Sequence, residues 1–304
     1  MIDMYLITGF LGSGKTTFLK NFINCFPDKK IYIIVNEFGK VGIDGTLLQS
    51  TGAGIAEINN GSMFCACRMD QFENALMNAI AVHPDILLIE TSGLSDPSRI
   101  NHIISTAEYS EIEYRGSICL IDAVNFLKVI ETAQNCRKQL LISSVVLINK
   151  CDLVLFDQLL KVQNAVYEIQ PSAKIYETEF GYFEEKWLQK VHPAGESAPT
   201  DNRPDITLQK AAIQIAPETS INEMKHILKF LKDFTFRIKG FVQLKEGVYF
   251  VDCTGMTISV TSAEQLPYTE TGTLVALAGR GMPLRNGIIE LKSRFPEEID
   301  KYEL

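Results

Sequence analysis

The chain lacks several features that would place it in a specialised class of protein. Its 304 residues carry 29 lysines and arginines against 37 aspartates and glutamates, and the net charge of −8 argues against general binding to nucleic acid or to an anionic membrane surface. No apolar run approaches the roughly 20 residues of a membrane-spanning helix. The N-terminus enters an apolar segment without the basic and cleavage regions of a signal peptide. We therefore expect a cytoplasmic protein that binds neither nucleic acid nor membrane.

Cysteine and histidine are also sparse. Seven cysteines are an odd number for a disulfide framework and indicate reduced thiols, and the four histidines form no metal-storage tract. The hydrophobic content of 46% and the charged content of 22% are ordinary for a globular protein. Five cysteines lie in or beside predicted helices and strands and are expected in the core: Cys25, Cys119, Cys136, Cys151 and Cys253.

The strongest pattern present is a phosphate-binding loop. Residues 9–16 read Gly-Phe-Leu-Gly-Ser-Gly-Lys-Thr and follow the apolar run 4–7. A buried strand, a glycine-rich turn and a helix beginning at Lys15 would point consecutive N–H groups at a polyphosphate. Lys15 would reach the β- and γ-phosphates, and the Thr16 hydroxyl would bind Mg²⁺. The nucleotide-binding residues predicted from this loop are Gly9, Gly12, Ser13, Gly14, Lys15, Thr16 and Thr17.

A second motif identifies the base. The apolar run 145–148 reads as a buried strand and leads into Asn149-Lys-Cys-Asp152. The Asp152 carboxylate would accept hydrogen bonds from N1–H and the exocyclic amine of guanine, a donor pair that adenine does not offer. Asn149 is expected to brace the loop and the O6/N7 edge, and the stem of Lys150 to lie over the base. The predicted nucleotide is GTP, with GDP as product.

Two other predicted strands end in acidic residues. The strand 85–90 ends at Glu90, which would hold Mg²⁺ through water or orient the attacking water. The N–H of Gly93, three residues on, would sense the γ-phosphate. Glu37 follows the second strand, where a nucleotide-sensing switch is expected. Solvated surface acids are the alternative for both glutamates. The predicted catalytic residues are Lys15, Glu90 and Glu37.

The order of elements predicts the fold. Strand and helix patterns alternate through roughly the first 190 residues, which indicates a P-loop NTPase domain, α/β in class, with a parallel sheet covered by helices on both faces. The polar, proline-rich segment 193–204 is read as a linker. We therefore predict a GTPase domain at 1–192 and a smaller α+β domain at 205–304. One helix is expected over 124–143, and the acidic end from residue 296 is expected to be a frayed tail.

Taken together, these motifs resemble the CobW-type GTPases, also described as cobalamin synthesis protein CobW. The resemblance implies a GTP-hydrolysing metallochaperone or insertase with a characteristic C-terminal domain, related more distantly to the nickel-insertion GTPases of hydrogenase and urease maturation. The matching segments are 9–17, 36–39 with Ile43-Asp44, 57–61, 90–93, 149–152 and, resembling an Arg-x-Lys-Gly signature of the second domain, 237–241.

One motif departs from the family pattern. Members usually carry Gly-Cys-x-Cys-Cys, whereas here Gly61 is followed by Ser-Met-Phe and then Cys65-Ala-Cys67. In an extended segment Cys65 and Cys67 point to the same face and would reach one ion, such as Zn²⁺ or Co²⁺. Two thiolates leave a tetrahedral site incomplete, so Glu37, a water, a histidine or a second chain in a homodimer would supply the rest. Two inert cysteines beside the nucleotide site are the alternative.

Two functions follow from this reading. The first is a GTPase whose switch is coupled to delivery of a divalent metal or a metal cofactor (zinc, cobalt or corrinoid-related) to a client metalloprotein or corrinoid protein. The alternative is a GTP-dependent assembly protein that acts on a corrinoid or other client without binding transferable metal. Metal titration of the GTP-bound protein distinguishes the two. An ATP-using kinase is disfavoured by Asp152.

Overall fold

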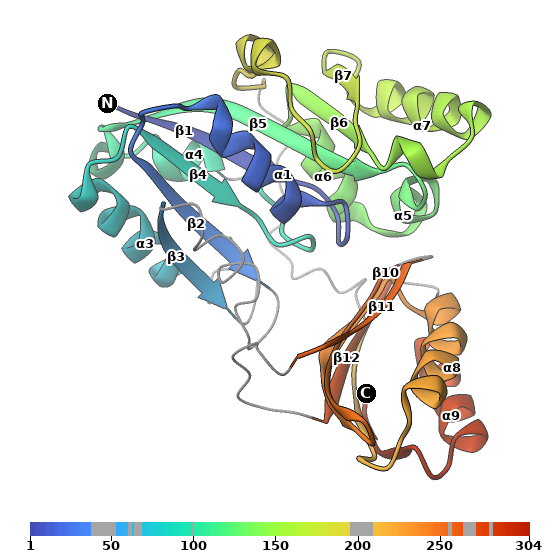
Figure 1. Ribbon diagram of the computed structural model, residues 1–304. Helices are drawn as coiled ribbons and strands as arrows, with labels where there is room; N and C mark the ends of the chain where they lie inside the picture. The colour runs from blue at the N-terminus through green and yellow to red at the C-terminus, as the bar shows by residue number, and fades with distance from the viewer. Residues whose placement is uncertain are drawn as a thin grey trace. The chain divides into compact units, whose positions relative to one another are not determined.

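The structure is a computed structural model of the chain (Figure 1). It describes residues 1–37, 53–59, 63, 69–98, 100–194, 209–254, 257–263, 272–279 and 282–304. The chain divides into two compact units: Met1–Ile130 with Gln134–Pro204, and Glu131–Ala133 with Asp205–Leu304.

The first unit is built on a seven-stranded parallel sheet in the order β3-β2-β4-β1-β5-β6-β7. Its strands are β1 (Ile2–Thr8), β2 (Ile31–Glu37), β3 (Gly54–Asn59), β4 (Ile86–Glu90), β5 (Ile112–Asp122), β6 (Val145–Asn149) and β7 (Lys174–Glu177). Its helices are α1 (Lys15–Phe22), α3 (Met69–Val82), α4 (Ile100–Ile104), α5 (Phe126–Thr132), α6 (Gln134–Leu141) and α7 (Phe156–Ile169). The predicted fold class is confirmed.

Side chains of the central strand alternate between two cores. Met4 and Leu6 of β1 join a cluster with residues of α3 and α4, whereas Tyr5 and Ile7 join a second cluster with Phe18 and other residues of α1. Because successive side chains of a strand point to opposite faces, the sheet is buried on both sides. This burial explains the continuous apolar runs of β4 and β6, in which every residue is buried.

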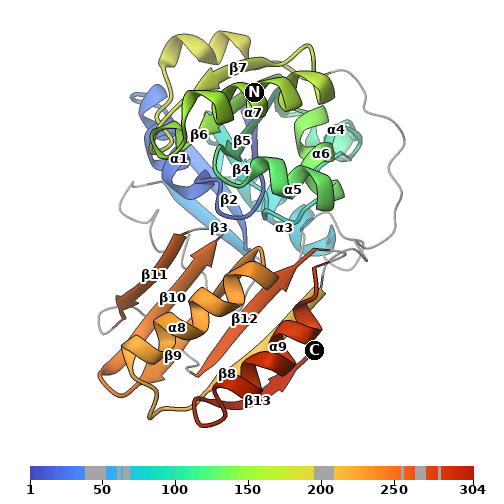
Figure 2. The same cartoon turned by 90° about the vertical axis from the view of Figure 1, so that its right-hand side faces the viewer.

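The second unit is a six-stranded antiparallel sheet in the order β11-β10-β9-β12-β8-β13. Helices α8 (Ile221–Leu231) and α9 (Leu284–Arg294) cover one face of it (Figure 2). Their apolar side chains and those of the strands form one core. The strands are β8 (Gln209–Ile215), β9 (Arg237–Leu244), β10 (Gly247–Thr254), β11 (Thr257–Ser262), β12 (Thr273–Ala278) and β13 (Ile299–Glu303).

The structure corrects two expectations about elements. The helix predicted over 124–143 is two helices, α5 and α6, separated at Ala133; neither glycine nor proline marks this break in the sequence. The predicted frayed tail is wrong, because β13 pairs with β8 and Ile299 is completely buried in the core of the second unit. The edge strands β3 and β7 were also not predicted; each lies at the rim of the sheet and lacks the continuous apolar run of β4 and β6.

Candidate functional site

The predicted site residues of the first unit gather at one edge of the parallel sheet. Strands β1, β4, β5 and β6 end at Thr8, Glu90, Asp122 and Asn149. Carboxyl ends of parallel strands meet at the same edge, which is where α/β sheets bind their ligands. Every described candidate residue follows or ends one of these strands, so the topology collects them around the loop between β1 and α1.

The phosphate-binding loop is shaped for close approach of a ligand to its backbone. Gly9, Gly12 and Gly14 have φ of 139°, 75° and 98°, in the region that favours glycine. A Cβ at Gly14 would lie 2.4 Å from Asn149 Nδ2. The Lys15 ammonium donates to the carbonyl oxygen of Gly9 at 2.9 Å, so its charge lies within the loop. A lysine held there is positioned to bind phosphate oxygens.

The end of β4 contacts this loop in two places. The Thr16 hydroxyl donates to Glu90 Oε1 at 3.4 Å, and Glu90 is 4% exposed. Hydroxyl and carboxylate oxygens are the ligands that Mg²⁺ prefers, so this pair fits a magnesium ion held near the phosphates. A Cβ at Gly93 would lie 2.5 Å from the main-chain nitrogen of Leu11, so only glycine permits this approach to the loop.

Asn149 connects three segments of the site. Its Nδ2 donates to the carbonyl oxygen of Ser13 at 2.8 Å, and its Oδ1 accepts from the N–H of Gly181 at 3.0 Å. The side chain is 2% exposed. Asn149 therefore fixes the phosphate-binding loop and the loop after β7 relative to the guanine motif. Asp152 lies in a short 3₁₀ helix (Cys151–Leu153) and is exposed to solvent.

Lys150 is fixed by a partner that the sequence pattern did not reveal. Its ammonium lies 2.7 Å from Asp122 Oδ2, and its φ of 65° places the residue in the left-handed region. Asp122 also accepts from the main-chain N–H of Val124 at 2.8 Å and from Asn125 Nδ2 at 2.9 Å. The ammonium is thus anchored between β5 and β6, which leaves the aliphatic stem as the part able to line a base.

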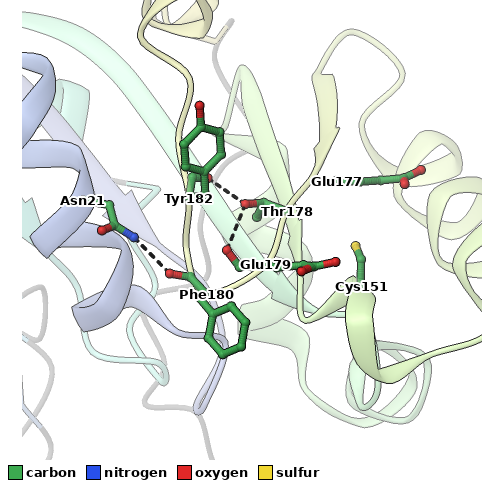
Figure 3. Close-up of a pocket in the computed structure, with 7 residues that line it drawn as sticks. All are labelled: Asn21, Cys151, Glu177, Thr178, Glu179, Phe180 and Tyr182. Carbon is green, nitrogen blue, oxygen red and sulfur yellow. Dashed lines mark hydrogen bonds between the residues drawn. The ribbon is translucent and has the colours of Figure 1, made fainter.

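A cavity of about 670 Å³ adjoins the guanine motif (Figure 3). Its lining includes Cys151 and the loop Thr178–Phe180, and this loop is the part of the site that sequence reasoning missed. Figure 3 shows Asn21 of α1 directed at the carbonyl of Phe180, a hydrogen bond of 3.0 Å. The N–H of Cys151 donates to the carbonyl oxygen of Thr178 at 3.3 Å, which ties this loop to the guanine motif.

The cysteines differ in burial. Cys119, Cys136 and Cys253 are buried as predicted, whereas Cys25 and Cys151 are only half-buried, a correction to their expected place in the core. Burial raises the pKa of Cys136 to about 12 and of Cys25 and Cys253 to about 11. These thiols therefore stay protonated near neutral pH in the metal-free protein.

Of the predicted metal-binding side chains, only that of Thr16 is described. Cys65, Cys67 and the side chain of Glu37 lie outside the described residues; only the backbone of Glu37, at the end of β2, is described. Among the described residues no group of three histidines, cysteines or acids is arranged to hold a metal ion. Nor does any helix in the described ranges have the length and apolarity needed to cross a bilayer.

Comparison with known proteins places these features in a family. Residues 3–177 match the family model described as CobW/HypB/UreG, nucleotide-binding domain. The chain is 39% identical over 152 residues to the zinc chaperone YeiR of Escherichia coli, a match covering 48% of this chain and 46% of the relative. It is 30% identical over 188 residues to the zinc chaperone YjiA of the same organism, covering 59% and 58%.

These matches are partial in length. The chain spans about half the length of the relatives it matches, 46% of YeiR and 58% of YjiA. Among solved structures, the Zn(II)-bound YjiA GTPase from E. coli aligns with a TM-score of 0.47 at 19% identity, over 97% of this chain and 98% of that chain.

Proposed function

Because the chain belongs to the CobW/HypB/UreG family, we propose that it is a GTPase whose nucleotide state controls the delivery of a divalent metal ion to a client protein. Zinc is the first candidate for the metal, since the relatives YeiR and YjiA are named zinc chaperones. The client in this proposal is a metalloprotein that receives the ion, and the protein works inside the cytoplasm.

The nucleotide half of the proposal is supported by one junction above all. Asn149 fastens the phosphate-binding loop at Ser13 to the guanine motif and to the loop at Gly181. A nucleotide bound at this edge would place its phosphates against the glycine-rich loop and its base beside Asp152 and the cavity at Cys151. A carboxylate at that position selects guanine over adenine.

The hydrolytic chemistry follows from the residues around the phosphates. Lys15 would neutralise charge that develops on the β- and γ-phosphates. Thr16 would hold Mg²⁺, which supplies electrostatic stabilisation of the transferred phosphoryl group, and Glu90 would either hold the ion through water or orient the attacking water. The sequence motifs supply no arginine finger in the same chain, so we expect slow intrinsic turnover that a partner accelerates.

The metal half of the proposal rests on Cys65 and Cys67, with Glu37 at the end of β2 as a candidate carboxylate ligand. Thiolates are strong ligands for Zn²⁺ and Co²⁺, and a tetrahedral site needs two further ligands. We propose that Glu37, a water, a histidine or the second chain of a homodimer provides them. The competing proposal is a GTP-dependent assembly protein that acts on a corrinoid or other client, and it requires no metal at these cysteines.

Hydrolysis assays test the enzymatic part directly. Lys15→Ala should abolish GTP hydrolysis, and Glu90→Gln should slow it about 100-fold or more while GDP affinity changes only a few-fold. Ser144→Ala, which changes a buried hydroxyl away from the loop, serves as a control for general loss of stability. Hydrolysis by Glu90→Gln at the wild-type rate would move the acidic role to Glu37.

A further inference from the structure

One buried carboxamide bonds three separate segments of the first unit. Asn36 lies next to the end of β2 and is 3% exposed. Its Oδ1 accepts from the main-chain N–H groups of Met63 at 3.0 Å and Ser92 at 3.4 Å, and from the Ser95 hydroxyl at 3.1 Å. Its Nδ2 donates to the carbonyl oxygen of Ile58 at 3.0 Å. Asn36 thus touches β3, the segment after β4 and the chain at Met63.

The segment after β4 is the nucleotide side of this junction. Gly93 lies between Ser92 and Ser95, and a Cβ there would lie 2.5 Å from the main-chain nitrogen of Leu11 in the phosphate-binding loop. From the opposite direction, Gln139 of α6 donates through Nε2 to the carbonyl oxygens of Gly93 at 3.2 Å and Ser95 at 3.0 Å. A γ-phosphate that binds the N–H of Gly93 would therefore act on the same short segment that Asn36 holds.

Met63 is the other side of the junction. It is completely buried, and its N–H is fixed by Asn36. Cys65 and Cys67 follow it by two and four residues in the sequence, and Glu37 follows Asn36 directly. The anchor at Met63 therefore stands at the start of the cysteine-bearing stretch.

The hydrogen bonds at Asn36 compete with one another. An amide oxygen offers two lone pairs, and here three donors meet one oxygen. The bond from Ser92 is the longest of the three, at 3.4 Å. Two of these donors belong to the segment Ser92–Ser95, so a shift of that segment would change how the oxygen is shared with the N–H of Met63.

We propose that Asn36 is the positioning residue that transmits occupancy of the γ-phosphate site to the main chain at Met63, which precedes Cys65 and Cys67 in the sequence. The inference rests on the proposed function, because it names the connection by which a nucleotide switch would change metal affinity. A ligand shifts an equilibrium only through different affinity for two arrangements, and the effect is reciprocal between the two sites.

Hydrogen exchange at the Met63 amide tests this connection without requiring a bound metal. The wild-type 304-residue chain, Asn36→Ala, Asn36→Asp and Ser95→Ala are compared in Mg²⁺ with GDP and with a non-hydrolysable GTP analogue. In the wild type, the Met63 amide should exchange at rates differing about fivefold or more between the two nucleotides. Asn36→Ala should reduce this difference to less than about twofold, whereas Asn36→Asp, which keeps the acceptor oxygens, should restore part of it.

Two controls make the outcome decisive. Ser144→Ala, a buried hydroxyl that accepts from the N–H of His192, should retain the wild-type difference. Ser95→Ala removes only one of the three donors, so its exchange difference between the two nucleotides should lie between those of the wild type and Asn36→Ala. This variant provides the test if Asn36→Ala fails to fold. The proposal would be overturned if the Asn36 and Ser95 variants kept the full wild-type difference in Met63 exchange rate between the two nucleotides. It would also be overturned if a wild type that binds both nucleotides showed no such difference. Failure of the proposed function has a separate signature, namely no GTP hydrolysis or no metal bound by the cysteines.

Discussion

At the residue scale, the site depends on buried polar side chains that hold loops in place. Asn149 and Asn36 are each almost fully buried, and each bonds segments far apart in the sequence. A buried amide that loses one partner costs about 1–3 kcal/mol, so these contacts constrain the loops strongly. Asp152, by contrast, is exposed and is free to meet a base from solvent.

Asp152 should set the preference for guanine. We expect the wild type to bind GTP at least about tenfold more tightly than ATP, because the carboxylate pairs with two donors that adenine lacks. Asp152→Asn should reduce this preference, since its amide nitrogen opposes the guanine donors. Competition titrations with a fluorescent nucleotide measure both affinities. Equal affinity of the wild type for GTP and ATP would refute the assignment of the base.

Gly93 should tolerate no larger residue. Gly93→Ala places a Cβ 2.5 Å from the main-chain nitrogen of Leu11, and backbone atoms cannot move aside as a flexible side chain would. We expect nucleotide affinity to fall about tenfold or more as the phosphate-binding loop shifts. Ala79→Gly, a change in the buried face of α3, is a control for stability loss alone. Unchanged GTP affinity in Gly93→Ala would show that this approach is not needed for binding.

At the element scale, local sequence patterns predicted the helices and strands that carry motifs. The other elements are positioned by contacts between residues distant in the sequence. The strand-loop-helix at Lys15 and the strand before Asn149 are recognisable because apolar runs, glycines and polar ends lie within a few residues. The short edge strands β3 and β7 carry weak patterns, and the loop Thr178–Phe180 joins the site only through bonds to distant residues. Single-sequence patterns hold no record of such contacts.

The last strand is the clearest example of an element that forms through contacts distant in the sequence. The segment after residue 296 is acidic and short, yet β13 pairs with β8, and Ile299 is completely buried. We expect Ile299→Ala to destabilise the second unit by about 2–5 kcal/mol, as for other buried isoleucines. Leu304→Ala changes a residue that is 56% exposed and should cost less than about 0.5 kcal/mol. Urea denaturation monitored by circular dichroism measures the free energy of unfolding of both variants. Equally small losses for the two substitutions would indicate that the C-terminal segment is frayed.

At the scale of the whole molecule, the proposal joins a GTPase unit to a metal site that only the sequence indicates. Coupling between the two requires that GTP and the metal favour the same arrangement of the chain, and the free energy of coupling is then the same whichever ligand is varied. The bonds at Asn36 provide a physical connection of this kind between the nucleotide edge of the sheet and Met63.

The most direct measurement is a Co²⁺ titration of the reduced protein with each nucleotide, wild type against the double variant Cys65→Ser/Cys67→Ser. Cobalt reports thiolate ligation through an intense charge-transfer absorption. The account predicts one Co²⁺ per chain, bound about fivefold or more tightly with a GTP analogue than with GDP, and no such band in the double variant. Absence of the band in the wild type, or equal affinity with both nucleotides, would contradict the account and leave a GTP switch that handles its client without metal.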